Sequence, residues 1–162
     1  MNDEMYNLMC ALDIEDNIEK LRYEKVILAT DADVDGLHIR NLLITYFFRF
    51  FEPLVHDGHL FVLETPLFRV RNKEKTIYCY SETERDAAGQ QLGKSAEITR
   101  FKGLGEISPA EFKQFIGPDM RLSRVEHAPK VDAANILGFY MGKNTPERKD
   151  YIMENLVVPV EE

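Results

Sequence analysis

Several kinds of signal are missing from this 162-residue chain, and each absence narrows what the protein can be. Its two cysteines, Cys10 and Cys79, are far apart and lack the paired spacing of a zinc site. We expect them to be reduced thiols of a cytoplasmic protein. No apolar run is long enough to span a bilayer, because the longest, Leu42–Phe51, is interrupted by Thr45 and Arg49.

Positive charge is also scarce, since 28 acidic residues against 20 basic ones give a formal net charge of −8. A freestanding nucleic-acid binder usually presents a basic surface to phosphate. Any contact with nucleic acid must therefore be local or depend on partners. Internal repeats and heptads are absent as well, and 44% hydrophobic residues suffice for the core of one domain.

The most informative stretch is Val26–Arg40, VILATDADVDGLHIR. A short apolar run stops at three acidic residues spaced two apart, and a glycine then opens a long hydrophobic run. This order predicts a strand, an acidic turn and a helix. Alternate residues of an extended turn point the same way, so the carboxylates of Asp31, Asp33 and Asp35 could converge. Such like charges favour a cation between them, and hard oxygen ligands suit Mg²⁺, Mn²⁺ or Ca²⁺.

Two other interpretations of the acidic turn are open. The letters D-A-D-V-D-G match the first half of a calcium-binding loop, but that loop needs a Glu at its twelfth position, which is Leu42 here, and a preceding helix. The turn could instead be a solvated segment that caps the next helix, where negative charge is favoured. Its place at the carboxyl end of a strand favours a binding site.

A second motif, K-G-L-G-E at Lys102–Glu106, follows a short predicted strand at residues 98–101. Two glycines around one leucine allow a tight backbone path or the close approach of another chain. The next residues, from Ser108 to Glu111, have the form of a helix start with a capping box. Glycine spacing of this kind is weak evidence when taken alone.

Together, TDADVDGLHIR and RFKGLGEISP resemble the second half of the TOPRIM region of bacterial type IIA DNA topoisomerase B subunits, meaning gyrase B or topoisomerase IV B. The similarity continues in the family's order through DGHLFVLETPLFRV and RKDYIMENL, and it covers nearly the whole chain. The family's first motif, a strand ending in E-G-D-S-A with the catalytic Glu, occurs nowhere in this sequence. We therefore expect a C-terminal piece of a longer subunit, with no catalytic residue of its own.

The resemblance also implies site residues, a cofactor and partners. Asp31 and Asp33 would hold Mg²⁺, which Mn²⁺ can replace, with Asp35 as an alternate ligand. Lys102, Arg40 and His38 would contact double-stranded DNA. The partner would be the topoisomerase A subunit, which carries the nucleophilic tyrosine, in an A2B2 heterotetramer away from any membrane. ATP would bind only in an N-terminal domain that this sequence lacks.

Each candidate DNA contact has a purely structural alternative. Lys102 could pair with a carboxylate of the acidic turn, and Arg40 could neutralise the same carboxylates. His38 could be an ordinary packed or capping residue. DNA contact is nonetheless a reasonable role for Arg40 and Lys102, because phosphate contacts come largely from arginine and lysine side chains.

The expected fold is α/β: a TOPRIM-like, Rossmann-type sheet with flanking helices that lacks its first strand, followed by a C-terminal helical appendage. We expect a partial TOPRIM core at residues 1–118 and a helical tail region at residues 119–162. Strands are expected at residues 26–30, 59–63, 67–71, 76–80, 98–101 and 121–125, and helices at 3–12, 37–54, 81–89, 108–117, 132–141 and 145–156. The helix at 37–54 is expected to be largely buried along a face that includes Leu42 and Phe50.

Two alternative functions are open beside a topoisomerase subunit. One is a divalent-metal-binding interaction module without catalysis, which the acidic charge and the absent Glu motif would suit. The other is a stand-alone TOPRIM nuclease or primase relative, against which the K-G-L-G-E segment argues. As a piece of a topoisomerase, the chain alone is expected neither to cleave DNA nor to hydrolyse ATP.

Overall fold

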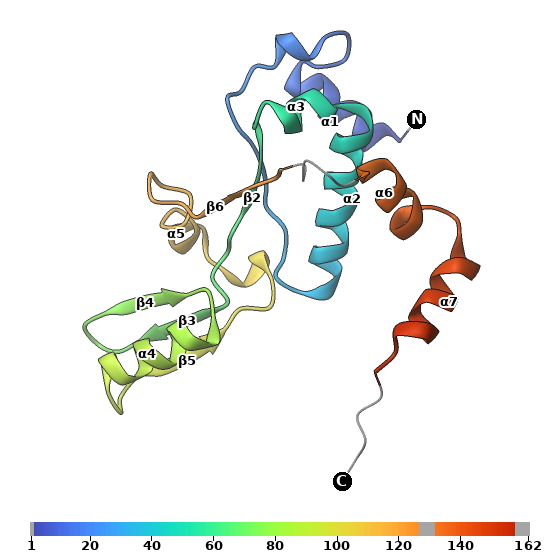
Figure 1. The fold of residues 1–162 in the computed structure, drawn as a ribbon. Helices are drawn as coiled ribbons and strands as arrows, with labels where there is room; N and C mark the ends of the chain where they lie inside the picture. The colour runs from blue at the N-terminus through green and yellow to red at the C-terminus, as the bar shows by residue number, and fades with distance from the viewer. Residues whose placement is uncertain (1, 127–131, 158–162) are drawn as a thin grey trace.

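A computed structural model of the chain describes residues 2–126 and 132–157, and its strands form two small sheets (Figure 1). The first sheet has the order β1-β2-β6, and the second has the order β4-β3-β5. The strands are β1 (Val26–Leu28), β2 (Leu60–Leu63), β3 (Phe68–Arg71), β4 (Thr76–Cys79), β5 (Glu97–Arg100) and β6 (Leu122–Arg124). The α-helices are α1 (Asp3–Leu12), α2 (Val34–Phe50), α3 (Glu52–His56), α4 (Glu82–Leu92), α5 (Pro109–Phe112), α6 (Ala133–Met141) and α7 (Thr145–Asn155). Two short 3-10 helices are η1 (Ile18–Lys20) and η2 (Leu104–Glu106).

The first sheet contains the expected α/β unit. β1 and β2 are parallel and are joined through α2 and α3, as a crossover between parallel strands requires. Apolar residues of both strands and of the helices form the largest core cluster of the described chain, with Phe47, Leu54 and Leu60 almost wholly buried. The crossover fixes the acidic turn at the carboxyl end of β1, directly before α2.

β6 completes this sheet by pairing antiparallel to β2, with Ser123 opposite Val62. It lies beyond residue 118, yet it belongs to the same sheet as β1 and β2. The division of the chain at residue 118 stays a prediction. An expected strand at residues 121–125 is confirmed.

Helix α2 is less buried than expected. Phe47 has no exposed surface, whereas Leu42 is 49% exposed and Phe50 is 63% exposed. Leu42 lies about 140° around the helix axis from the buried Phe47, and Phe50 is the last residue of the helix, so neither is covered by the core. One side of α2 packs against the sheet and α1, and apolar residues on the other side face solvent.

The chain after α2 also differs from the expectation of one continuous helix. α2 ends at Phe50, and Pro53 lies in the first turn of the separate helix α3. Proline is tolerated there because the first-turn N–H groups have no partner within the helix. α3 then ends before Asp57 and Gly58, where the sequence predicted a turn into β2.

In the second sheet, β3 is the central strand, and its two faces differ. Phe68 and Val70 are buried with Cys79 of β4 against α4, which contributes Ala88 to the cluster. The intervening Arg69 lies opposite Tyr78 of β4 and Thr99 of β5, so the register brings these three side chains to the same stretch of the sheet. α4 begins at its expected Ser81 cap but ends at Leu92 rather than near Gly89, because the next residue, Gly93, has a positive φ that does not continue a helix.

The last two helices confirm the expected helical appendage. α6 contacts α2, and α7 extends from α6 away from both sheets (Figure 1). Arg148 holds their junction, since its Nη1 donates to the carbonyl oxygens of Phe139, Tyr140 and Gly142. From the sequence we expect the tail at residues 157–162 to fray, and of these residues 158–162 lie outside the described part of the chain. None of the described helices combines the length and the apolar character needed to cross a bilayer.

Candidate functional site

The acidic turn is built around a helix cap. Asp33 is the N-cap of α2, and its Oδ1 accepts a hydrogen bond of 2.7 Å from the backbone N–H of Gly36. Gly36 is buried, and a Cβ at this position would lie 2.1 Å from the carbonyl oxygen of Asp31. The glycine of D-A-D-V-D-G is therefore required for the turn to fold back over Asp31.

The K-G-L-G-E segment meets the acidic turn directly. The backbone N–H of Leu104 donates to Asp31 Oδ1 at 2.6 Å, a contact that spans 73 positions of the sequence. A Cβ on Gly103 would lie 3.1 Å from Asp31 Cγ, so the first glycine permits this close approach. The two motifs singled out in the sequence thus form one site at the carboxyl end of β1.

The structure does not bring Asp31, Asp33 and Asp35 into one cluster. Within residues 2–126 and 132–157, no group of three or more His, Cys, Asp or Glu side chains is arranged to hold a metal ion. The extended turn ends at Asp33 because α2 begins at Val34, so Asp35 follows the rotation of a helix and not the alternation of a strand. The assignment of these three residues as metal ligands stays a prediction.

Two of the carboxylates nonetheless keep oxygen atoms available. Oδ1 of Asp31 and Oδ1 of Asp33 each accept one backbone hydrogen bond, and neither Oδ2 accepts one from a described residue. Mg²⁺ is commonly bound through one or two carboxylates, with waters and substrate phosphate as its remaining ligands. The donor set of the acidic turn fits such an ion.

The cationic candidates do not neutralise the acidic turn. Arg40 is half-buried, and its Nε donates to the hydroxyl of the buried Thr30 at 3.2 Å. Lys102 is exposed, and its backbone N–H donates to Glu106. In the part of the chain that the structure describes, neither side chain forms an ion pair with an aspartate. His38 is exposed on α2. Contact of the three with DNA stays a prediction.

A cavity of about 460 Å³ lies beside Arg40. It opens between the start of α2, the end of β2 and the edge of the second sheet. Its lining residues are Ala32, Leu37, Arg40, Val62, Leu63, Glu64, Thr65, Leu67, Tyr80 and Ser123. Arg40 therefore borders open space next to the acidic turn.

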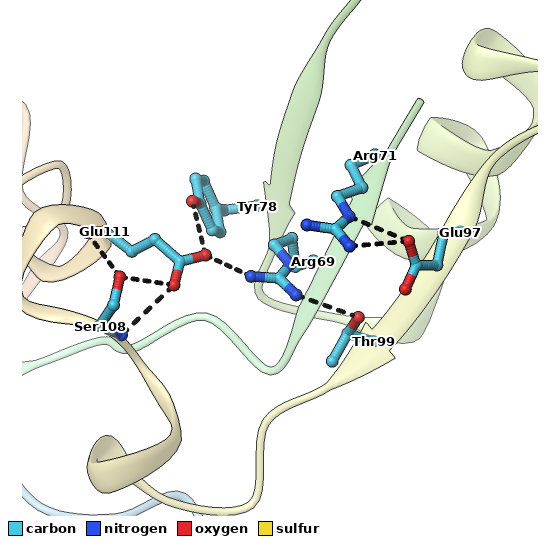
Figure 2. Close-up of polar contacts among 7 residues, drawn as sticks. All are labelled: Arg69, Arg71, Tyr78, Glu97, Thr99, Ser108 and Glu111. Carbon is cyan, nitrogen blue, oxygen red and sulfur yellow. Dashed lines mark hydrogen bonds and ion pairs between the residues drawn. The ribbon is translucent and has the colours of Figure 1, made fainter. Parts of the chain in front are cut away.

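A network that the sequence did not predict lies at the start of α5 (Figure 2). Arg69 Nη1 donates to Glu111 Oε1 at 2.5 Å, and the hydroxyl of Tyr78 donates to the same oxygen at 3.2 Å. Glu111 Oε2 accepts from the Ser108 backbone N–H and hydroxyl, and the Glu111 backbone N–H donates to Ser108 Oγ, which completes the expected capping box. The hydrogen bond from Arg69 is the main cause that lowers the pKa of Glu111 from 4.5 to about 2.

The capping box was visible in the sequence, but its arginine was not. Arg69 lies 42 positions before Glu111, and only its place between the buried Phe68 and Val70 sets it on the opposite face of the strand. The same network affects Tyr78, whose pKa is raised by burial first and by the negative charge of Glu111 second.

Comparison with known proteins gives two family matches along the chain. Residues 8–65 match the Toprim domain, and residues 93–153 match the carboxyl terminus of the DNA gyrase B subunit. The chain is 59% identical over 157 residues to the B subunit of DNA topoisomerase 4 from Borreliella burgdorferi, which covers 96% of the chain and 26% of that protein. It is 41% identical over 142 residues to the B subunit of DNA gyrase from Thermus thermophilus, which covers 86% of the chain and 22% of that protein.

The fold is also similar to a solved structure. The Plasmodium falciparum topoisomerase II DNA-binding, cleavage and re-ligation domain superposes with a TM-score of 0.76 at 24% sequence identity, over 96% of this chain and 22% of that one. At this identity the likeness concerns the fold. The chain spans about a quarter of the length of the curated relatives it matches.

Proposed function

Because this chain belongs to the family of type IIA DNA topoisomerase B subunits, we propose that it forms the Mg²⁺-binding part of the Toprim region and supports DNA cleavage and rejoining together with an A subunit. One observation carries the proposal. The K-G-L-G-E segment donates a backbone hydrogen bond to Asp31 at the carboxyl end of β1, beside Asp33 at the start of α2.

Asp31 and Asp33 would be the residues that hold the ion, with Asp35 as an alternate ligand. The N–H of Leu104 fixes the orientation of the Asp31 carboxylate through Oδ1 and leaves Oδ2 for the ion. Bound there, Mg²⁺ would supply positive charge to the oxygen that leaves phosphorus as the 3′ hydroxyl of DNA.

Arg40, Lys102 and His38 would hold the DNA backbone next to the acidic turn. The overall charge of −8 opposes DNA binding, so contact must be confined to this site and supported by the partner protein. We propose an A2B2 assembly with the A subunit, which would supply the nucleophilic tyrosine. ATP hydrolysis would belong to another part of the full-length protein, and the chain alone would be inactive in cleavage.

The first test is calorimetric titration of the chain with Mn²⁺, for the wild type and the variants Asp31→Asn and Asp33→Asn. We expect binding by the wild type and its loss in both variants. Asp119→Asn is a matched control, because it removes an exposed aspartate outside the acidic turn, and it should bind like the wild type. Equal binding by all four proteins would contradict the assignment of Asp31 and Asp33.

The second test places this sequence in the corresponding region of a complete topoisomerase B subunit and adds the A subunit and supercoiled DNA. Cleavage that is lost with Asp31→Asn supports the topoisomerase role. If the chain binds Mn²⁺ but the chimeric enzyme is inactive while the parent enzyme cleaves, a metal-binding interaction module is the better description. Cleavage by the isolated chain would instead favour a stand-alone nuclease.

A further inference from the structure

The loop that contacts Asp31 is held in place from the second sheet. The K-G-L-G-E segment runs from the end of β5 to the start of α5, so its path is set by where these two elements lie. Arg69 touches both of them: its Nη1 donates to Glu111 of α5, and its Nη2 donates to Thr99 of β5 at 3.4 Å. One guanidinium thus ties together the two ends of the loop (Figure 2).

Glu111 connects Arg69 to Ser108, which follows the loop. It accepts from Arg69 and Tyr78 on one oxygen and from Ser108, two residues after the segment, on the other. All four lone-pair positions of the carboxylate are therefore used. The ring of Tyr78 packs edge-on against Phe115 of the small core beneath the segment, with centroids 4.6 Å apart.

Burial strengthens the ion pair between Arg69 and Glu111. The side chains of Arg69 and Glu111 are each 19% exposed, so their attraction is screened less than that of a surface pair. Arg69 Nε is buried and has no hydrogen-bond partner among the described residues, so the guanidinium is oriented by its two Nη contacts. A forked contact of this kind suits arginine and not lysine.

The position of the K-G-L-G-E segment affects Asp31 through the contacts of Gly103 and Leu104. The contacts there are short, 2.6 Å from Leu104 N to Asp31 Oδ1 and 3.1 Å from an ideal Gly103 Cβ to Asp31 Cγ, so a small displacement of the segment would break or crowd them. We propose that Arg69 and Glu111 are positioning residues for the metal site, which set the K-G-L-G-E segment so that it orients the Asp31 carboxylate. This inference rests on the proposed function for its metal-binding part only.

The structure contains a matched control on the same strand. Arg71 is paired with Glu97 of β5 at 2.9 Å, two residues from Arg69, and Figure 2 shows both pairs side by side. The Arg71 pair is 45% and 60% exposed, and among the described residues the Arg71 side chain forms hydrogen bonds and ion pairs with Glu97 of β5 and with no residue of α5 or the segment. Arg71→Gln therefore removes the same kind of ion pair without loosening the loop.

The test measures the hydrogen-exchange rate of the Leu104 amide by NMR, on the whole chain and at one pH. The proteins compared are the wild type, Arg69→Gln, Glu111→Gln, Arg69→Lys and Arg71→Gln. We expect Leu104 exchange to rise by about tenfold or more in the Gln variants of Arg69 and Glu111, because charged hydrogen bonds hold its position. Arg71→Gln should leave it within about twofold. Arg69→Lys keeps the charge and should recover part of the protection.

Melting temperatures separate positioning from general stability. If Leu104 exchange in Glu111→Gln and Arg69→Lys equals that of the wild type while melting temperatures fall, the network only stabilises the fold and the inference is overturned. These two variants decide the question even where Arg69→Gln does not fold, because each changes one feature of the pair. Glu111→Gln keeps the shape of the side chain and removes its charge, and Arg69→Lys keeps the charge and removes the forked contact.

Mn²⁺ titration of the same proteins adds the functional readout. We expect Mn²⁺ affinity to fall in Arg69→Gln and Glu111→Gln and to stay unchanged in Arg71→Gln. Unchanged affinity beside altered Leu104 exchange would overturn the link to the metal site. A wild-type chain that binds no Mn²⁺ would instead count against the proposed function, while the exchange result would still decide whether the network positions the segment.

Discussion

The acidic turn and the Arg69 network, meaning Arg69, Tyr78, Thr99, Ser108 and Glu111, use carboxylates in opposite ways. In the turn, Asp31 and Asp33 each accept one backbone hydrogen bond and keep a second oxygen without a partner among the described residues. In the network, both oxygens of Glu111 are occupied. The first arrangement leaves negative charge for an external cation, whereas the second uses the charge to hold the fold together.

The difference predicts opposite responses to substitution. Loss of charge in the turn should reduce metal binding and leave stability almost unchanged. Loss of charge in the network should reduce stability first and affect the metal site through the K-G-L-G-E segment. Backbone geometry is a third case, because a change at Gly36 should reduce both the stability of the protein and metal binding at the turn.

Gly36→Ala should have the largest effect. The added Cβ would lie 2.1 Å from the backbone oxygen of Asp31, so either α2 or the turn must move. Crowding of this kind costs about 3 kcal/mol, which exceeds the gain of about 1 kcal/mol from replacing glycine by alanine in a helix. We expect lower stability in urea unfolding, together with weaker Mn²⁺ binding.

Gly105→Ala is the control for that experiment, because a Cβ at Gly105 would meet no atom within 4 Å. Its unfolding free energy should stay within about 0.5 kcal/mol of the wild type. A Gly36→Ala protein as stable as Gly105→Ala would show that the turn in solution does not have the close contact between Gly36 and Asp31.

Glu111→Gln should reveal the pH dependence of the network. In the folded protein the pKa of Glu111 is lowered to about 2 from its ordinary 4.5, chiefly by the hydrogen bond from Arg69. A carboxyl whose pKa is lower in the folded state stabilises the fold above its unfolded pKa and loses that contribution as pH falls toward the folded one. The unfolding free energy of the wild type should therefore exceed that of the variant by about 3 kcal/mol near pH 6, and this difference should shrink between pH 4.5 and pH 2.

Urea unfolding of both proteins at several pH values measures this difference. The pKa of Glu84 is also lowered, mainly by the backbone N–H of Tyr80, but Glu84 is present in both proteins and cancels in the comparison. A difference that stays constant from pH 6 to pH 2 would mean that Glu111 acts through shape alone.

The sequence predicted the local parts of both regions well. The short apolar strand before Asp31 and the capping box at Ser108 depend on neighbours within a few residues, and each is present. The helix after the turn begins at Val34, three residues before its expected start at residue 37. The glycines of K-G-L-G-E were expected to allow a tight backbone path or the close approach of another chain, and the first of them, Gly103, lies against Asp31.

Contacts between distant segments were not predictable in the same way. The pair of Arg69 and Glu111 depends on how β3 and α5 pack, and no pattern within either segment specifies it. The expected convergence of three aspartates assumed an extended turn, but the helix begins at Val34 and rotates Asp35 out of line. The exposure of Phe50 likewise depends on how far the small sheet reaches along α2.

The smallest stability effect, and the sharpest separation of the two regions, is expected at Asp33. Asp33→Ala removes the cap of α2 and should cost about 1 kcal/mol, whereas Asn caps helices as well as Asp and should change stability by no more than about 0.5 kcal/mol. Both variants remove the carboxylate oxygen that we propose for the metal, so both should lose Mn²⁺ binding. Stability and metal binding would then vary independently at Asp33, in contrast to Glu111. Mn²⁺ binding that follows the cap instead, retained in Asp33→Asn and lost in Asp33→Ala, would mean that Asp33 serves the fold of the turn and that Asp31 must recruit its other ligands elsewhere.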